Sequence, residues 1–296
     1  MLQRSPTYIV SLPGEDKWAL RFRKILPSKA AYMLTRWKNV LWGLFTFNLA
    51  RKKPAGFKER LLNMVREEMG PDVDMTNFTP SYNPWDQRLC LVPDSDLFAS
   101  IKSGKASIVT DHVETFTKDG IKLKSGKMLE ADVVVTATGL KMLTGGSAAI
   151  SVDGQPVNFG EKINYKGVMF SGIPNFGMTM GYTNASWTLK ADLTSEYVCR
   201  LINMMDRKGT PIATPTLPAG ETMGTEPMLD FSSGYVQRAI AQLPKQGDRK
   251  PWRLNQNFPK DIINLRHKAV DDGVIVFSKP VAVTDGRREP EVIAAE

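Results

Sequence analysis

The chain has 296 residues, of which 42% are hydrophobic, so it can bury a substantial core in one large domain or two smaller ones. With two cysteines, the chain has too few thiols for a disulfide framework, which favours a reducing cytoplasm. With two histidines, it also has few residues for a metal site or a Ser-His-Asp triad. The net charge of +8 lies at the front, where the first 70 residues hold 14 Lys and Arg against 5 Asp and Glu. Such a segment is typical of a contact with nucleic acid, anionic lipid or a phosphorylated cofactor, or of a solvated helical face. No helix-turn-helix, zinc or RNA-binding signature accompanies the charge, which argues against nucleic acid.

The first quarter of the chain predicts a short strand followed by helices. Residues 8–10 have strand character, and helical periodicity then occupies residues 16–70, with Pro27 and Pro54 as breaks. Within this segment, residues 30–53 are apolar but carry too many charges to span a bilayer. Two interpretations stay open for them: peripheral contact with a membrane surface and, as the favoured one, a buried helix at a domain or subunit contact.

The middle of the chain changes to β structure. Residues 113–116 and 121–123 predict strands of a meander, with a turn at Asp119 and Gly120 between them. The meander leads into residues 131–139, where a continuous run of valines predicts a strand buried on both faces in a parallel sheet.

The second half predicts two more strands and a long helix. The strands are expected at residues 168–170 and 176–180. The helix is indicated by apolar residues at intervals of four, which are Leu189, Leu193, Tyr197, Leu201 and Met205. Gly209 marks its end, and the remaining tail is rich in Pro and Gly, with a short amphipathic helix at 235–243.

The end of the predicted buried strand carries the most informative short sequence. Ala137, Thr138 and Gly139 bring nearly bare backbone to the edge of a sheet, where a ligand or another segment can approach closely. With the valine run and the meander, this ending resembles the second half of a nucleotide-binding domain in two-dinucleotide flavoproteins. There, Ala-Thr-Gly marks the crossing between the NADPH and FAD domains, which implies that Thr138 and Gly139 line the flavin. An ordinary strand-to-loop glycine is the alternative.

A second motif runs from Tyr82 to Asp94 and resembles a segment of Baeyer-Villiger monooxygenases, which are class B flavoprotein monooxygenases. On that resemblance Arg88 is the catalytic arginine beside the flavin. Oxygen transfer in this family runs through a peroxyflavin, and a planar guanidinium that stays protonated at any working pH suits its negative charge. The alternative is a structural arginine that pairs with Asp86 or Asp94.

The same motif departs from some members of the family. Gln87 stands where they carry a lysine that helps to hold the NADPH phosphate. The resemblance therefore makes Gln87 a cofactor-binding candidate, while the absence of that cation weakens the expectation of strict NADPH preference.

Two further segments are candidate cofactor contacts. Arg4 and Ser5 follow the opening strand, at the place where a Rossmann unit meets the adenine ribose and an arginine accepts the 2'-phosphate of NADP. Tyr182, Asn184 and Trp187 precede or begin the long helix, whose N-terminus favours the negative charge of a reduced flavin. An ordinary helix cap at Asn184 or Ser186 is the alternative for this segment. For Trp187, core packing and a wall of the substrate cavity both stay open.

Neither a G-x-G-x-x-G loop nor the family signature F-x-G-x-x-x-H-x-x-x-W-P occurs in the chain. Since that loop cradles the dinucleotide phosphates, we expect a C-terminal portion of such an enzyme that binds FAD poorly by itself. The expected fold class is α/β: an incomplete two-dinucleotide-binding-domain flavoprotein with a helical insert and a β-meander. The expected domains are a remnant of the NADP-binding Rossmann domain at 1–15, the helical insert at 16–75, the remainder of the NADP domain with the meander at 76–140, the C-terminal part of the FAD-binding domain at 141–215, and a C-terminal extension at 216–296.

The resemblance implies that the complete enzyme uses FAD and NADPH to insert an atom of molecular oxygen into a ketone or onto a thioether. One alternative within the class is an N- or S-oxygenating flavin monooxygenase. Another is a non-catalytic fragment whose basic helices bind a membrane surface through 30–53 or a partner chain. A separate N-terminal half is a further expected partner.

Overall fold

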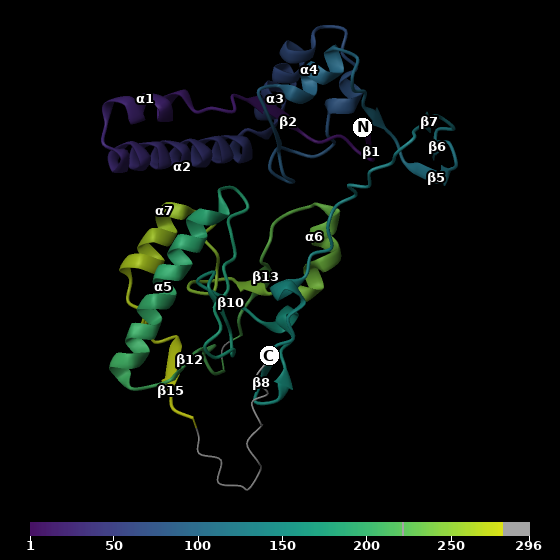
Figure 1. Cartoon of the computed structure of the whole chain (residues 1–296). Coiled ribbons are helices and arrows are strands. Elements are labelled where there is room, and N and C mark those ends of the chain that lie inside the picture. Colours follow the sequence, from purple (N-terminus) through teal and green to yellow (C-terminus); the bar gives the residue numbers. More distant parts are fainter. Residues whose placement is uncertain (221, 281–296) are drawn as a thin grey trace, which may run out of the picture. The chain divides into compact units, whose positions relative to one another are not determined.

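A computed structural model describes residues 1–220 and 222–280, and the chain divides into two compact units with mixed α and β structure (Figure 1). Unit 1 contains Met1–Gly146, Tyr182–Ser186 and Leu229–Leu243. Unit 2 contains Ser147–Gly181, Trp187–Met228 and the chain from Pro244 onward. Both units are discontinuous in sequence, so segments far apart in the chain contribute to one core.

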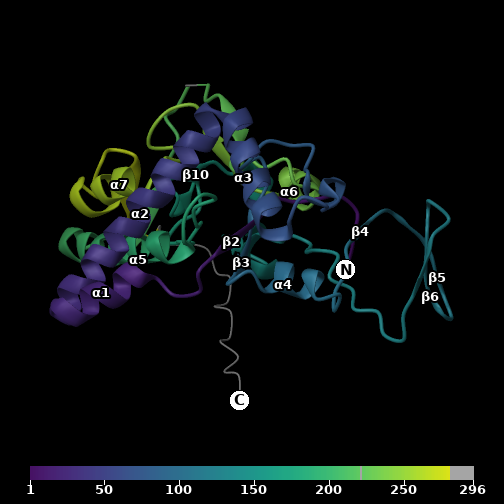
Figure 2. The ribbon, with the colours of Figure 1, turned by 90° about the horizontal axis from the view of Figure 1, so that it is seen from above.

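Three helices follow the first two strands of unit 1: α1 (Lys17–Ile25), α2 (Ser28–Lys52) and α3 (Pro54–Met69). Asp16 caps α1 by accepting hydrogen bonds from the backbone N–H groups of Trp18 and Ala19, and it also pairs with Lys38 of α2. These contacts hold α1 beside α2, as both ribbon views show (Figures 1 and 2). The helical character expected for residues 16–70 is confirmed. Among the described residues, no helix is long and apolar enough to cross a bilayer.

Parallel strand pairs flank these helices. β1 (Leu2–Gln3) pairs with β4 (Val109–Thr110), and β2 (Ile9–Leu12) pairs with β3 (Cys90–Pro93). The other elements of this region are the short turn η1 (Met75–Phe78) and the helix α4 (Asp96–Lys102). β2, α3, η1 and α4 share a core made of Ile9, Val65, Phe78 and Phe98. Parallel pairing through long crossovers is the pattern of α/β proteins.

The expected meander is confirmed. β5 (Val113–Thr117), β6 (Gly120–Leu123) and β7 (Met128–Glu130) form a three-stranded antiparallel sheet in that order. Gly120 has a φ of +148°, and a Cβ at this position would collide with the backbone carbonyl of Leu129 on the neighbouring strand. Steric exclusion of a side chain therefore explains why glycine is present at this turn.

The strand expected within residues 131–139 is not formed, and this prediction is wrong for the chain as described. The segment has no regular secondary structure and pairs with none of the described strands. Val133 and Val135 are 78% and 84% exposed. A strand that is apolar on both faces requires neighbouring strands for its backbone groups and other elements to cover its faces. The described residues supply neither.

Unit 2 contains the long helix α5 (Trp187–Lys208), which ends at Gly209 as expected. Its antiparallel strand pairs are β8 (Ser151–Val152) with β9 (Gln155–Pro156), β10 (Asn164–Tyr165) with β11 (Met169–Phe170), β12 (Ile212–Pro215) with β15 (Ile275–Ser278), and β13 (Thr225–Pro227) with β14 (Lys245–Gly247). Its shorter helical elements are η3 (Phe159–Glu161), α7 (Phe258–Asp261) and η5 (Ile262–His267).

One strand expected in this unit is present and the other is absent. β11 forms within residues 168–170, as predicted. Residues 176–180 form no strand, because Phe176 and Met178 instead pack against the buried cluster of Phe159, Phe170 and Ile173. The prediction of a strand at residues 176–180 is therefore wrong.

Buried tyrosines should make the fold sensitive to alkaline pH. Burial raises the pKa of Tyr8 to about 12, and it also raises the pKa values of Tyr82, Tyr165 and Tyr197. A pKa that is higher in the folded state contributes stability that is complete below the unfolded value of 10.0 and is lost as pH rises through the folded value. We therefore expect the Tm to fall between pH 10 and about pH 12, where Tyr8 gives up its contribution.

Ultraviolet titration of tyrosinate, recorded beside thermal unfolding, tests this expectation. The chain has 7 tyrosines, and those that are buried should ionise together with unfolding, above the pH at which exposed tyrosines ionise. Tyr8→Phe is the control, because it removes one raised pKa and should flatten the decline in Tm. A single titration of all tyrosines near pH 10 with an unchanged Tm would contradict the expectation.

Candidate active site

A tight turn positions the segment that carries Arg88. The backbone N–H of Asp86 donates to the carbonyl of Asn83 at 3.1 Å, and an Asp86 carboxylate oxygen accepts from the backbone N–H of Asn83 at 3.1 Å. Pro84 and Trp85 occupy the two central positions, and Trp85 has a φ of +71°, which is unfavourable for a residue with a side chain. Packing of the Trp85 ring edge-on against Phe47 of α2, with ring centroids 5.5 Å apart, helps to stabilise this conformation.

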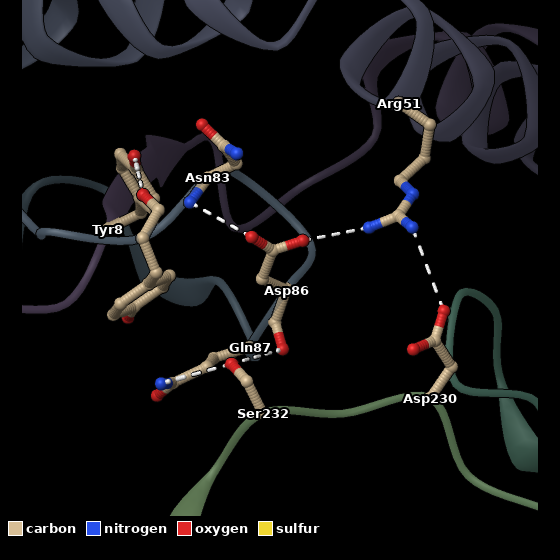
Figure 3. A network of polar contacts seen from close by, with 8 residues as sticks. Tyr8, Arg51, Asn83, Asp86, Gln87, Asp230 and Ser232 are labelled. Carbon is tan, nitrogen blue, oxygen red and sulfur yellow. Dashed lines mark hydrogen bonds and ion pairs between the residues drawn. The ribbon is translucent and has the colours of Figure 1, made fainter. Parts of the chain in front are cut away.

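Arg51, near the end of α2, links this turn to a distant segment of unit 1 (Figure 3). One of its guanidinium nitrogens lies 2.8 Å from Asp86 Oδ1, and the other lies 3.6 Å from Asp230 Oδ2. The three side chains are 43%, 31% and 95% exposed, so each pair contributes little stability by itself. The two pairs instead orient the chain, because one planar guanidinium contacts both the loop of Asp86 and the loop of Asp230.

Residues next to Asp230 make further contacts with the turn (Figure 3). The backbone N–H and the hydroxyl of Ser232 donate to the carbonyl of Asp86 at 3.1 and 3.2 Å. Gln87 Nε2 lies 3.5 Å from Ser232 Oγ. Gln87 therefore has a structural contact in addition to the cofactor role that the sequence suggested.

The side chain of Arg88 is exposed, and its guanidinium lies 5.8 Å from the ring centroid of the buried Phe231. Neither carboxylate that the sequence offered as a partner is paired with it. Asp86 is paired with Arg51, and Asp94 accepts a hydrogen bond from the backbone N–H of Gly14 at 2.8 Å. Within residues 1–220 and 222–280, the Arg88 guanidinium has no carboxylate partner. The described residues therefore do not form the structural ion pair between Arg88 and Asp86 or Asp94 that was the alternative.

The structure brings the opening segment next to the segment of Arg88. Thr7 Oγ1 donates to the carbonyl of Arg88 at 3.5 Å and accepts from the hydroxyl of Tyr82 at 2.9 Å. The hydroxyl of Tyr8 donates to the carbonyl of Tyr82 at 2.6 Å, and the two rings meet edge-on. Arg4 and Ser5, which lie three and two residues before Thr7 on the same segment, are exposed. The candidate NADP residues and the candidate catalytic arginine thus lie on adjoining segments of one unit.

Thr138 and Gly139 line a cavity of about 420 Å³ in unit 1. Its other wall comes from α6 (Gly234–Ala239) and the adjoining η4 (Ile240–Gln242). The lining residues are Thr138, Gly139, Leu140, Lys141, Met142, Tyr235, Arg238, Ala239 and Gln242. Arg88 is not among them, although Phe231, on which it rests, lies three residues before α6.

The remaining candidates, Tyr182, Asn184 and Trp187, do not all belong to the same unit. Tyr182 and Asn184 are buried, at 3% and 6% exposure, in the short segment Tyr182–Ser186 of unit 1. Trp187 begins α5 of unit 2 and is 55% exposed, so it is not the core residue that was the alternative. Gly181 lies directly against the Trp187 ring, where a Cβ would collide.

Sequence reasoning missed several residues that complete this region. Arg51, Asp230, Phe231 and Arg238 were given no role, although the helix at 235–243 was correctly expected. The only signal in the sequence was the apolar face of that helix, since contacts across 35 to 146 positions leave no local pattern.

Solved structures with a similar fold are flavin-dependent monooxygenases. A steroid monooxygenase bound to NADP matches 94% of this chain and 62% of its own, with a TM-score of 0.62 at 16% identity. OTEMO, solved in complex with FAD and NADP, matches 73% of this chain and 50% of its own, with a TM-score of 0.55 at 17% identity. The chain therefore has the α/β fold of flavin-dependent monooxygenases.

Sequence relatives identify the group more closely. The FAD-containing monooxygenase EthA of Mycobacterium tuberculosis is 48% identical over 287 residues, which cover 96% of this chain and 58% of that protein. The probable FAD-binding monooxygenase AlmA of Acinetobacter baylyi is 44% identical over 294 residues, which cover 99% of this chain and 59% of that protein. No model of a known protein family matches the chain. The chain is homologous to FAD-containing monooxygenases, as its motifs indicate, and it spans less than two thirds of the length of these relatives.

Proposed function

We propose that the chain is the C-terminal portion of an FAD- and NADPH-dependent monooxygenase that performs Baeyer-Villiger oxygen insertion. In the complete enzyme the substrate is a ketone or a thioether, and molecular oxygen is the second substrate. One observation carries the proposal: the Arg88 guanidinium has no carboxylate partner among the described residues, although Asp86 is only two positions away and pairs with Arg51 instead. A permanently charged group left available in this way can stabilise negative charge that develops on oxygen.

The neighbouring residues have complementary roles. Arg4 and Ser5 bind the 2'-phosphate of NADPH, a task that suits a guanidinium and a hydroxyl. The contact of Thr7 with the backbone of Arg88 keeps their segment beside the catalytic arginine. Gln87 is uncharged and hydrogen-bonds weakly to Ser232, so it adds orientation rather than charge to the phosphate site.

The residues present fit part of FAD. The cavity beside Gly139 has about 420 Å³, which lies within the roughly 300–1,000 Å³ of small-molecule sites. Thr138 and Gly139 let a flat ring approach the backbone, and Lys141 and Arg238 add positive charge. Tyr182 and Asn184, which belong to the same unit, are further flavin contacts. A bound flavin would supply the redox chemistry that connects NADPH with molecular oxygen. The pyrophosphate has no glycine-rich cradle in this chain.

The exposed valines of residues 131–139 support the proposal that a further segment completes unit 1. A run that is apolar on both faces and 78–84% exposed at Val133 and Val135 is a surface that a neighbouring strand would cover. The part of the relatives that this chain does not span is the natural source of that strand. Two origins of the chain are compatible with this proposal. A truncated gene product would lack the covering strand, whereas half of a split enzyme would obtain the strand from a separate N-terminal half.

Cofactor content tests the proposal directly. The chain is purified alone and also together with the N-terminal part of the 48% identical relative, and bound flavin is measured by its absorbance and fluorescence. We expect little or no FAD on the chain alone, because the phosphate cradle supplies much of dinucleotide affinity. The combined protein should retain FAD and consume NADPH and oxygen when a ketone is added. Stoichiometric FAD on the chain alone would refute the incomplete site, and a flavin-loaded assembly that leaves both ketones and thioethers unchanged would refute the activity.

A further inference from the structure

Unit 2 contains a second cavity, of about 340 Å³, which has no part in the flavin site proposed above. Pro251, Leu254, Ala269 and Val274 give it an apolar wall. Its charged lining residues are Lys166, Lys250, Arg253, Lys268, Asp261 and Asp272. Cations thus outnumber carboxylates around a space large enough for a small molecule.

Both carboxylates are already compensated by partners within unit 2. Asp261 accepts from the buried Lys190 at 2.8 Å and from Asn255 Nδ2 at 2.7 Å. Asp272 pairs with Lys166 at 2.7 Å and accepts from the hydroxyl of Tyr165, also at 2.7 Å. The negative charge of the lining is therefore held by these partners.

The cations are compensated less completely. Lys166 is held by Asp272 and by the rings of Tyr165 and Tyr197, whose centroids lie 5.0 and 5.3 Å from its ammonium. Arg253 pairs with Glu226 at 3.2 Å, where both side chains are about half exposed. The ammonium groups of Lys250 and Lys268 have no carboxylate partner within the described residues, which leaves an excess of positive charge at the cavity.

The electrostatics of Lys166 agree with this excess. Burial is the main cause that lowers the pKa of Lys166, Asp272 opposes it, and the charges of Lys268 and Arg200 lower the pKa further. Lys268 is therefore close enough to repel Lys166. Arg200 is fixed nearby because it donates to the backbone carbonyls of Leu265 and Lys268, the latter at 2.7 Å. Lys166 and Lys268 both line the cavity, so an anion bound there would relieve the repulsion between their charges.

We propose that this cavity binds a small organic carboxylate, with Lys250 and Lys268 holding the carboxylate group and the apolar wall covering a short alkyl chain. The uncompensated cations select the charge, and Pro251, Leu254, Ala269 and Val274 select an apolar body over a bare oxyanion. The site lies wholly within unit 2, so its occupancy does not depend on flavin or NADPH.

Binding is measured on the whole chain by isothermal titration and by the shift in Tm at constant ionic strength. Hexanoate is the probe, hexanol tests the need for charge, and inorganic phosphate tests the need for an apolar body. We expect hexanoate to bind saturably and to raise the Tm, and hexanol and phosphate to bind at least about tenfold more weakly. Hexanol or phosphate binding as tightly as hexanoate would overturn the proposal, as would the absence of hexanoate binding.

Variants locate the site. Lys250→Gln with Lys268→Gln should weaken hexanoate binding by about tenfold or more, because it removes both uncompensated cations. The matched control is Lys118→Gln with Lys124→Gln, which removes the same charge from exposed positions near the meander of unit 1 and should bind as the parent does. Lys268→Arg keeps the charge and should retain binding. The proposal would be refuted if the control variant weakened hexanoate binding equally, or if the Lys250 and Lys268 double variant bound hexanoate as the parent does.

Discussion

Replacing Lys190 by methionine is expected to lower the free energy of unfolding by about 3–5 kcal/mol. Lys190 Nζ lies 2.8 Å from Asp261 Oδ2, and the two side chains are only 2% and 5% exposed. Methionine fills a similar volume but leaves the carboxylate of Asp261 buried without its opposite charge, and the amide of Asn255 is a weak substitute. Urea denaturation followed by circular dichroism measures the loss.

Two further variants separate the buried pair from a general effect of removing lysine. Lys190→Met with Asp261→Leu should recover most of the lost stability, because neither charge then remains buried. Lys122→Met removes a lysine from an exposed pair with Glu114, at 3.1 Å and with 43% and 45% exposure, and should cost at most about 1 kcal/mol. Equal losses for Lys190→Met and Lys122→Met would show that the buried pair has no special role in stability.

Replacing Arg88 by alanine should slow ketone oxygenation by about 10²–10³-fold in a complete enzyme. The substitution is made in this chain, which is assayed together with the N-terminal part of the 48% identical relative. A fixed positive charge matters when negative charge develops on oxygen, whereas hydride transfer from NADPH precedes that step. Rapid-mixing measurements of flavin reduction should therefore remain close to those of the parent while ester formation collapses.

The control and the substrate distinguish the alternatives for Arg88. Arg66 is an exposed helix residue whose guanidinium contacts Asn63, and its replacement by alanine in the same assembly should leave ester formation unchanged. Loss of ketone oxidation with retained sulfoxidation would support Baeyer-Villiger chemistry at this arginine, because an electrophilic oxygen donor needs the cation less. Unchanged ester formation in the Arg88 variant would refute the catalytic assignment.

The candidate site was only partly accessible from the sequence. The motif around Arg88 and the segment of Arg4 and Ser5 could be recognised because the residues of each are consecutive. The parallel strand pair β2–β3 brings the two segments together. The residues that contact Asp86, and so leave Arg88 without this carboxylate as a partner, could not be recognised in this way. Arg51 lies 35 positions from Asp86, and Ser232 lies 146 positions from it.

The sequence by itself determined the helices between residues 17 and 69, the three-stranded meander and α5. Helical periodicity and the turn at Asp119 and Gly120 act over a few residues, so they can be recognised without knowledge of distant contacts. Only the tertiary structure decided that Asp86 pairs with Arg51, that Arg88 lies against Phe231, and that residues 131–139 form no strand. Ion pairs and buried strands depend on groups far away in the chain, and the energy of a charge or of an apolar run is set by what surrounds it.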